Sequence, residues 1–181
     1  RENKIINDLL DLVKLDKKGA NLNIKSQDVN ELVERILKRL QPLAAKSNIE
    51  LVFESFRPVT AEIDEVKIAL VITNLVENAI KYSFRGYEGA HRLTIEVSKA
   101  EEQMHIIIAN NGRHIEEDQL KDLNMGKEIK NHFGISNVRK RLKLYYGEDA
   151  VIYFENVSPS GVKVHLFVPL QEEQKDEDSS Y

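Results

Sequence analysis

The strongest hydrophobic pattern in the chain lies between Ile63 and Ser83. At helical spacing, apolar side chains cover most of this segment: Ile68, Val71, Ile72, Leu75, Val76, Ala79 and Ile80. A helix that is apolar on nearly every side is buried. Its polar exceptions are Asn74, Asn78 and Lys81, which share one narrow face because they recur at i, i+4 and i+7, with Tyr82 at the edge.

Burying two carboxamides and an ammonium group is costly unless a polar partner meets them. The polar stripe on the 63–83 helix therefore predicts a groove that holds a polar ligand. In the alternative interpretation, the two Asn side chains cap a neighbouring loop and Lys81 extends to solvent.

The rest of the pattern alternates between helical and extended segments. Helical periodicity predicts helices over 1–17, 28–44, 116–123 and 134–147. Asp28, with Glu31 three residues later, forms a capping-box pattern, and Pro42 should kink the helix or end it early. The 134–147 helix should bury Ile135, Val138, Leu142 and Tyr145. Strands are predicted over 21–26, 49–56, 59–61, 92–98, 104–110, 151–155 and 162–169.

This order of elements favours an α+β fold. Adjacent hairpin strands and separate helices fit a two-layer sandwich, in which a mixed sheet carries its helices on one face. A doubly wound fold needs alternating strand–helix units and fits the two hairpins poorly. We expect one domain over 20–170 and a separate helix end over 1–18. Residues 124–132 are expected to form a mobile loop, and the acidic tail 171–181 to be disordered.

Composition narrows the function classes. The net charge of −4 over 181 residues gives no reason to expect nucleic-acid binding. The absence of cysteine excludes disulfides and thiolate metal sites. The five His residues show no zinc-binding spacing, and no apolar run approaches the roughly 20 residues of a membrane span. The chain lacks an initiator Met, so we expect it to be a piece of a longer protein.

Four segments resemble one known family, the catalytic ATP-binding domains of sensor histidine kinases, whose superfamily includes gyrase, Hsp90 and MutL. TNLVENAIKYS at 73–83 resembles the N box, and IIIANNGRHI at 106–115 stands in place of the first glycine box. FGISNVRKRLKLYYG at 133–147 resembles the second glycine box and its helix, as found in kinases of the autolysin-regulator type. LLDLVKLDKK at 9–18 resembles the end of a dimerisation helix.

The resemblance implies the Bergerat ATP-binding fold, with ATP and Mg²⁺ as cofactors. It assigns Asn78 as the metal ligand, Asn74 and Lys81 as catalytic groups that contact phosphates or a metal-bound water, and Tyr82 to the adenine pocket. The remaining implied nucleotide contacts are Asn110, Gly112, Ile115, Phe133, Gly134, Ile135 and Ser136. The backbone amides at 134–136 begin a helix and suit phosphate oxygens. Residues 116–133 would form a lid.

Three positions depart from the family's pattern. Asn110 replaces the Asp that reads adenine, His114 replaces a Gly, and Val162 replaces a Thr. A carboxamide both donates and accepts, so Asn110 can still accept the adenine amino proton. Relatives that hydrolyse ATP carry Glu where this chain has Asn74, and a carboxamide cannot act as a base near neutral pH. The sequence thus favours phosphoryl transfer over hydrolysis.

The resemblance implies an enzyme that transfers the γ-phosphate of Mg-ATP to a His outside this chain, and from there to a response regulator. Its other partner would be the phosphoacceptor helices of the same or a second kinase chain. The expected location is cytoplasmic, and the sequence leaves a membrane anchor upstream open. One alternative, motivated by Asn110, His114 and Val162, is a degenerate domain that binds little nucleotide and serves as an interaction module. A serine kinase of the anti-sigma type is a third interpretation, which the dimerisation-helix segment disfavours.

Overall fold

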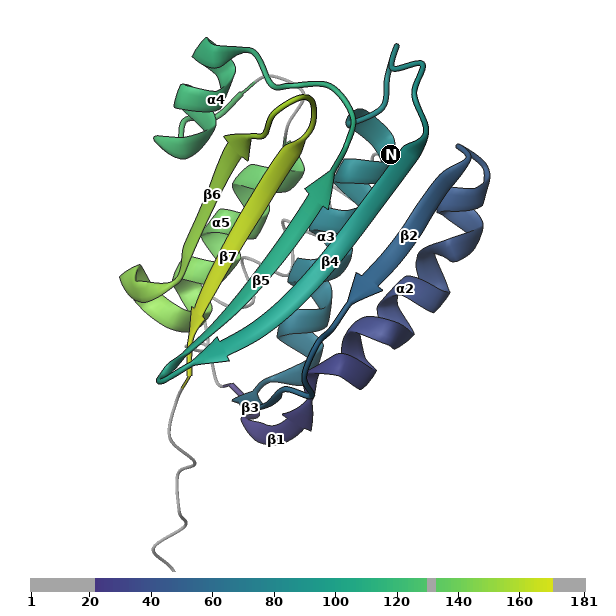
Figure 1. Ribbon diagram of the computed structural model, residues 1–181. Coiled ribbons are helices and arrows are strands. Elements are labelled where there is room, and N and C mark those ends of the chain that lie inside the picture. The colour runs from purple at the N-terminus through teal and green to yellow at the C-terminus, as the bar shows by residue number, and fades with distance from the viewer. Residues whose placement is uncertain (1–21, 130–132, 171–181) are drawn as a thin grey trace, which may run out of the picture.

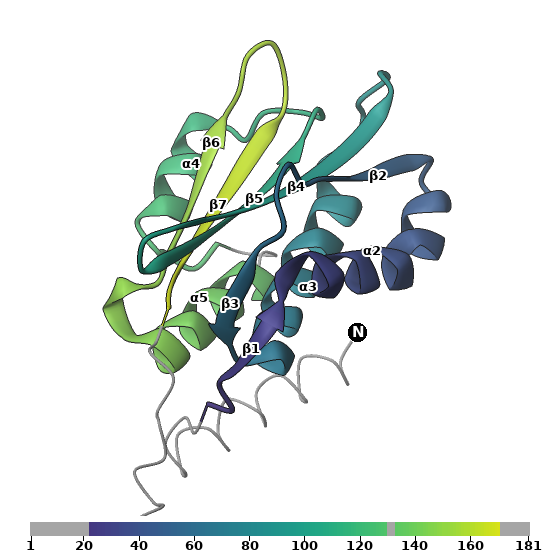
Figure 2. The same cartoon turned by 60° about the horizontal axis from the view of Figure 1, so that its bottom comes forward.

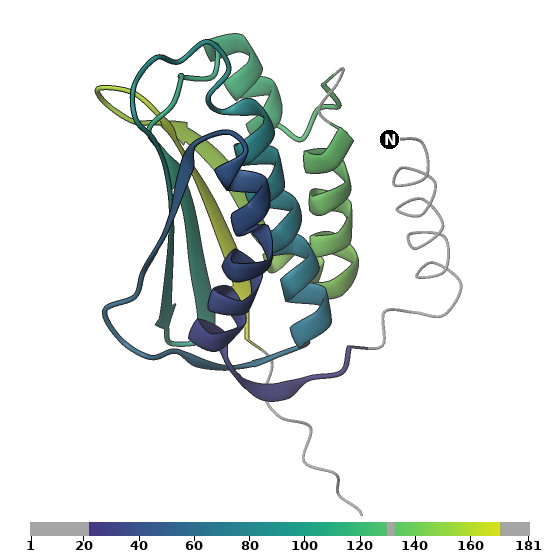
Figure 3. The same cartoon turned by 90° about the vertical axis from the view of Figure 1, so that its right-hand side faces the viewer.

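The computed structural model describes residues 22–129 and 133–170. The predictions for the helix at 1–17, the tail at 171–181 and the end of the loop at 124–132 therefore lie outside the described residues. The described part forms a mixed sheet with its long helices packed on one face (Figures 1 and 3). The predicted α+β sandwich of two layers is confirmed.

The main sheet brings together strands that are far apart in sequence. Its spatial order is β2 (Ile49–Glu54), β4 (His91–Ala100), β5 (Gln103–Asn110), β7 (Val162–Pro169) and β6 (Val151–Asn156). β2 runs parallel to β4, whereas the other neighbours are antiparallel. The register pairs Asn110 with Val162, so two of the positions that depart from the family's pattern are neighbours in the sheet.

A second, two-stranded sheet consists of β1 (Lys25–Asp28) and β3 (Thr60–Ile63), which lie side by side near the start of the central helix (Figure 2). The strand predicted over 21–26 is therefore displaced towards the C-terminus. Its actual position follows from pairing, because Lys25 to Asp28 are the residues that face β3. The alternation of 21–26 alone does not show this partner.

Two helices begin with aspartate caps. Asp28 Oδ1 accepts a hydrogen bond from the Glu31 amide at 3.0 Å and starts α2 (Val29–Ala45), as predicted. Pro42 does not end this helix early. It lies inside the last turn of the helix, which continues to Ala45 without the backbone hydrogen bond that residue 42 would otherwise donate to the Lys38 carbonyl oxygen. Asp64 starts α3 (Glu65–Tyr82): one carboxylate oxygen accepts from the Lys67 amide at 3.1 Å and the other from the Asn23 amide at 2.8 Å.

The central helix α3 lies beneath the sheet, between α2 and α5 (Phe133–Tyr146) (Figure 3). Every apolar side chain predicted to be buried on α3 is buried: Ile68, Val71, Ile72, Leu75, Val76, Ala79 and Ile80. Inward-facing residues of the strands complete the core, including Leu93, Ile95, Ile106, Ile108 and Leu166. The buried helix predicted from the sequence is thus the centre of the hydrophobic core.

The inner face of α5 differs from the prediction at one residue. Val138, Leu142 and Tyr145 are buried as expected, and Ile135 is half-buried. Arg141 is also completely buried, although arginine is seldom found in that position. Arg141 lies three residues after Val138, so helical spacing predicts that its side chain faces the core. Its charge instead predicts that the side chain faces solvent.

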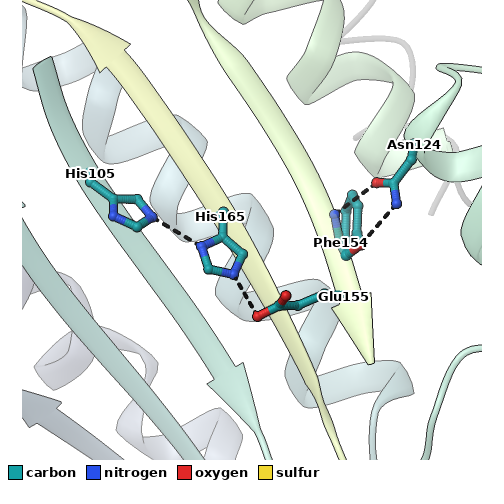
Figure 4. Close-up of polar contacts among 5 residues, drawn as sticks. All are labelled: His105, Asn124, Phe154, Glu155 and His165. Atoms are coloured by element: carbon teal, nitrogen blue, oxygen red, sulfur yellow. Dashed lines mark hydrogen bonds and ion pairs between the residues drawn. The ribbon is translucent and has the colours of Figure 1, made fainter. Parts of the chain in front are cut away.

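The predicted helix at 116–123 is present as α4 (Glu117–Asn124), beside the edge strand β6 (Figure 1). Its C-terminal residue, Asn124, contacts the backbone of Phe154 in β6 (Figure 4). The first part of the proposed lid is therefore an ordered helix attached to the sheet. None of the helices in the described part is long and apolar enough to cross a membrane.

The face of the sheet opposite the helices carries a row of histidine and aromatic rings. His105 Nε2 lies 3.0 Å from His165 Nδ1, and His165 Nε2 lies 3.0 Å from Glu155 Oε1 (Figure 4). With an ionised Glu155 and neutral rings, one proton arrangement makes both bonds: each His carries its proton on Nε2 and donates. The rings of Tyr153 and Phe167 stack on this pair.

His105 should make stability depend on pH. Burial, and secondly the neighbouring His165, lower the pKa of His105 below its usual 6.5. The folded state therefore favours the neutral ring, and this contribution is complete above pH 6.5 and declines as the pH falls through the lowered pKa. Urea unfolding at a series of pH values from 7 to 5 should show a shallower loss of stability for His105→Gln than for the wild type. Equal slopes would contradict this assignment.

Candidate functional site

A cavity of about 310 Å³ opens at one end of the sheet. The end of α3, the end of β5, the start of α5 and the β6–β7 hairpin converge there. Its walls are mainly apolar, and they contain five of the residues predicted for the site: Asn78, Tyr82, Asn110, Ile115 and Ile135. The remaining lining is supplied largely by Leu75, Ala79, Ile108, Leu123, Ile129, Phe154, Val162 and Val164. The structure thus brings predicted residues from three distant segments to one cavity.

Asn78 and Gly134 are in close contact at the edge of this cavity. A Cβ atom placed on Gly134 would lie 2.7 Å from Asn78 Nδ2 and 3.1 Å from Asn78 Oδ1. Glycine therefore lets the start of α5 lie directly against this carboxamide, which would have to move if residue 134 carried a side chain. The start of α5 and Asn78, two parts of the predicted site, are thus neighbours in the structure.

The other predicted residues near Asn78 lie around the cavity. Asn74 is half-buried one turn earlier on α3 and does not line the cavity. Gly134 and Ser136 are half-buried in the first turn of α5. Phe133 is the first residue of α5, and its side chain lies outside the described part of the structure.

Asn110 lies at the inner end of the cavity and is only 7% exposed. Its Oδ1 accepts a hydrogen bond from the backbone amide of Gly112 at 3.0 Å. The carboxamide is thereby oriented by the chain itself, and the Nδ2 group has no hydrogen-bond partner within the described residues. Asn110 can therefore offer a donor to a ligand, and the second lone pair of its oxygen can accept.

Gly112 places the loop after β5 directly against the end of α3. A Cβ atom at this position would lie 2.2 Å from the carbonyl oxygen of Ser83. The next amide, that of Arg113, donates to the same oxygen at 3.1 Å. This close approach of two backbones joins the segment that carries Asn110 to the segment that carries Asn78 and Tyr82.

Tyr82 lines the cavity with part of its ring. The Arg85 guanidinium lies over that ring at 4.8 Å from the centroid, and Arg85 Nε donates to the carbonyl oxygen of Lys81 at 3.1 Å. One face of the tyrosine is thus in contact with a cation.

The prediction that Lys81 is buried is wrong. Its side chain is 45% exposed, does not line the cavity, and lies 3.9 Å from Glu77 Oε2. Lys81 occupies the last turn of α3, where the flexible stem of the side chain can reach water. For Lys81 alone, the alternative in which this side chain extends to solvent is therefore the correct one.

Several cavity residues were not identified from the sequence. Arg113 lines the cavity, and its Nη1 donates to the Arg85 carbonyl oxygen at 3.5 Å. Gln119 contributes a polar side chain from α4. His114, which the sequence had already singled out because it stands where the family has glycine, also lines the cavity, and its Nε2 lies 2.8 Å from the Val157 carbonyl oxygen. The position of Arg113 inside the NNGRHI turn was the available signal for it.

The described residues contain no preformed cluster of metal-binding side chains. Among residues 22–129 and 133–170, no group of three or more His, Asp or Glu side chains could hold a metal ion. The oxygen of Asn78 is the predicted metal ligand that borders the cavity. This donor suits a hard cation whose remaining ligands are water and the oxygens of a bound anion.

Comparison with known proteins agrees on one family. Residues 63–172 match the family described as histidine kinase-, DNA gyrase B-, and HSP90-like ATPase. The sensor histidine kinase WalK of Bacillus subtilis (strain 168) is 24% identical over 189 residues, which cover 96% of this chain but 29% of WalK.

Solved structures show the same fold. Full-length ShkA in complex with AMPPNP matches with a TM-score of 0.75 over 92% of this chain and 35% of that chain, at 17% identity. The histidine kinase ThkA in complex with the response regulator protein TrrA matches with a TM-score of 0.71 over 96% of this chain and 50% of that chain, at 23% identity. The chain spans less than a third of the length of WalK and half or less of these two solved chains.

Gly112→Ala should destabilise the fold at the cavity. The added methyl group would overlap the Ser83 carbonyl, and overpacking of this kind costs about 1–3 kcal/mol in the free energy of unfolding. Urea unfolding measures this loss. Glu116→Ala is the control, because Glu116 is exposed, lies in the same loop and makes no side-chain cap hydrogen bond. A change of less than about 0.5 kcal/mol is expected there, and an equally small effect of Gly112→Ala would contradict the close contact.

Proposed function

Because the chain belongs to the family of histidine kinase-, DNA gyrase B- and HSP90-like ATPases, we propose that it is the ATP-binding catalytic domain of a two-component sensor histidine kinase. The observation that carries this proposal is the contact between the Asn78 carboxamide and the start of α5 at Gly134, beside a cavity that ends at Asn110. That arrangement provides separate places for a base and for a chain of phosphates.

The cavity fits a nucleobase. Its walls are aliphatic at Leu75, Ile108 and Val164, and such surfaces suit the flat faces of a purine. Asn110 supplies the polar contact at the inner end. Its oxygen can accept a proton from the adenine amino group, and its Nδ2 can donate to a ring nitrogen. Val162, directly paired with Asn110, adds an apolar contact where relatives carry a hydroxyl.

The phosphates would lie between Asn78 and the start of α5. The first amides of α5, at Gly134, Ile135 and Ser136, have no partners within the helix and carry the positive end of the helix dipole. Asn78 would supply one oxygen to Mg²⁺, and Asn74, one turn earlier, would hold a phosphate or a metal-bound water. When bound, Mg²⁺ offsets phosphate charge and orients the transferred group.

Lys81 would contribute a mobile positive charge. Its ion pair with Glu77 is long, at 3.9 Å, and lies on an exposed surface, so the pair is weak. The ammonium group could therefore leave Glu77 for a phosphate at little cost. Hydrolysis of ATP would need a base that activates a water molecule. Asn74 is a carboxamide, and the carboxylate of Glu77 faces Lys81, which supports transfer to a protein acceptor over hydrolysis.

In the proposed reaction, an imidazole nitrogen of the acceptor His attacks the γ-phosphorus. The bond from phosphorus to the β–γ bridging oxygen breaks, and ADP leaves. The acceptor His would belong to dimerisation helices of the same or a second kinase chain, and a response regulator would take the phosphoryl group next. The complex of ThkA with TrrA supports this choice of partner. We also propose a cytoplasmic location, where ATP is available.

Asn78→Ala should weaken Mg-ATP binding about ten- to a hundredfold, which corresponds to the loss of an interaction with a charged ligand. Isothermal titration calorimetry of the purified chain, with Mg²⁺ and with EDTA, measures the affinity and its metal dependence. Asn48→Ala, in the turn between α2 and β2, is a control far from the cavity in sequence and outside its lining. Unchanged affinity and metal dependence in Asn78→Ala would refute the proposed site.

Asn110→Asp should bind ATP about ten- to a hundredfold more tightly than the wild type, because a charged acceptor makes the stronger hydrogen bond to the adenine amino group. GTP is the control ligand, since it presents a carbonyl oxygen instead of an amino group, and its binding should not improve. Calorimetry distinguishes the alternatives. Binding only in the variant, or in neither protein, would indicate a degenerate interaction module.

A further inference from the structure

The edge strand β6 is paired on its outer side by side chains. Asn124, at the end of α4, donates from Nδ2 to the Phe154 carbonyl oxygen at 2.8 Å and accepts the Phe154 amide on Oδ1 at 2.8 Å (Figure 4). This pair of bonds reproduces the exchange between two antiparallel strands. A single carboxamide therefore replaces the missing neighbour of β6 and fixes the end of α4 to it.

A second side chain connects α4 to the same strand. Arg139 of α5 donates from Nη2 to the Leu123 carbonyl oxygen at 2.7 Å and from Nη1 to the Ile152 carbonyl oxygen at 3.2 Å. The first acceptor is at the C-terminal end of α4, where a cation is favourable. Arg139 thus joins three elements, namely α4, α5 and β6, and burial lowers the pKa of its guanidinium group.

The loop that precedes α4 is held to β6 in the same way. Asn156 accepts the Ile115 amide at 2.9 Å and donates to the Ile115 carbonyl oxygen at 2.8 Å. The segment 115–124 is consequently fixed to β6 at both of its ends.

These connections lie next to the cavity wall. Leu123, whose carbonyl oxygen binds Arg139, and Phe154, whose backbone pairs with Asn124, both line the cavity. Gln119 of α4 lines it as well. A change in the position of α4 would therefore move one complete side of the cavity while leaving Asn78 and Asn110 in place.

We propose that Asn124 and Arg139 are positioning residues for the nucleotide: they hold α4 on β6, so that the α4 side of the cavity exists before the ligand arrives. The inference rests on the proposed function. Neither residue lines the cavity, and each acts through backbone groups of its neighbours. Preorganisation of this kind raises affinity because binding need not order the wall.

The chemistry of each connection suggests a minimal variant. Asn124→Asp keeps the size of the side chain and the acceptor for the Phe154 amide, but it sets a carboxylate oxygen against the Phe154 carbonyl. Arg139→Gln removes the positive charge and one of the two hydrogen bonds that the guanidinium group donates. Gln103→Glu matches Asn124→Asp, because it adds a negative charge at the end of β5 that is farther from Asn110. Lys143→Gln matches Arg139→Gln, because it removes a positive charge from an exposed position of α5. These two are the matched controls.

Three quantities are measured for each protein: Mg-ATP affinity by calorimetry, amide hydrogen exchange in α4 and in β5, and the urea midpoint. We expect Asn124→Asp and Arg139→Gln each to weaken Mg-ATP binding about tenfold. Exchange should accelerate in α4 and not in β5, and the controls should match the wild type. A purely structural role would lower the urea midpoint and leave the affinity unchanged.

Two results would overturn the positioning role. One is affinity within twofold of the wild type although α4 exchanges faster, and the other is unchanged exchange in α4. Asn124→Ser, which retains one bond, serves as the milder variant if either of the others fails to fold. A wild-type chain that binds no Mg-ATP would refute the proposed function and with it the positioning role, whereas normal wild-type binding with unaffected variants would refute the positioning role alone.

Discussion

The structure depends on the burial of α3, which lies beneath the sheet and between α2 and α5. The apolar residues of this helix contact both layers, and each fully buried side chain of this kind contributes about 1.5–3 kcal/mol. Among the residues of this helix that line the cavity, Asn78 places its carboxamide against the start of α5. The same packing that stabilises the domain therefore determines where a polar ligand can meet it.

Two glycine contacts position the other walls of the cavity around α3. Gly134 lets α5 approach Asn78, and Gly112 lets the loop after β5 approach Ser83. A side chain at Gly112 would overlap the Ser83 backbone, and one at Gly134 would displace the Asn78 carboxamide. The cavity is thus defined by backbone positions around α3 more than by its individual lining residues, which can vary in chemistry, as Asn110 and Val162 do here.

The sequence predicted the parts of the fold that depend on local pattern. The apolar periodicity located α3, and Asp28 located the start of α2, because both signals lie within a few residues of the feature they predict. The N-box and glycine-box segments likewise located Asn78 and Gly134. The register of β1 was missed because it depends on β3, more than 30 residues later in the chain.

Features set by tertiary contacts could not be predicted. The exposure of Lys81 depends on where the sheet stops covering α3. Arg141 is buried against neighbours that its own helix does not reveal. The connections made by Asn124 and Arg139 join elements about 15 to 30 residues apart. Nothing in the local sequence indicates that a polar residue at the end of a short helix pairs with the backbone of a strand.

The position of β7 has a consequence for synthesis of the protein. β7 is the last described strand in the chain, yet it lies inside the sheet, between β5 and β6. Chains emerge from the ribosome with the N-terminal part first. Until Val162 to Pro169 have emerged, β5 has no partner on that side and the cavity lacks Val162 and Val164. A nascent or truncated chain without this strand would contain every N-box residue and still have no enclosed site. The ability to bind a ligand should therefore appear only once β7 has been added to the sheet.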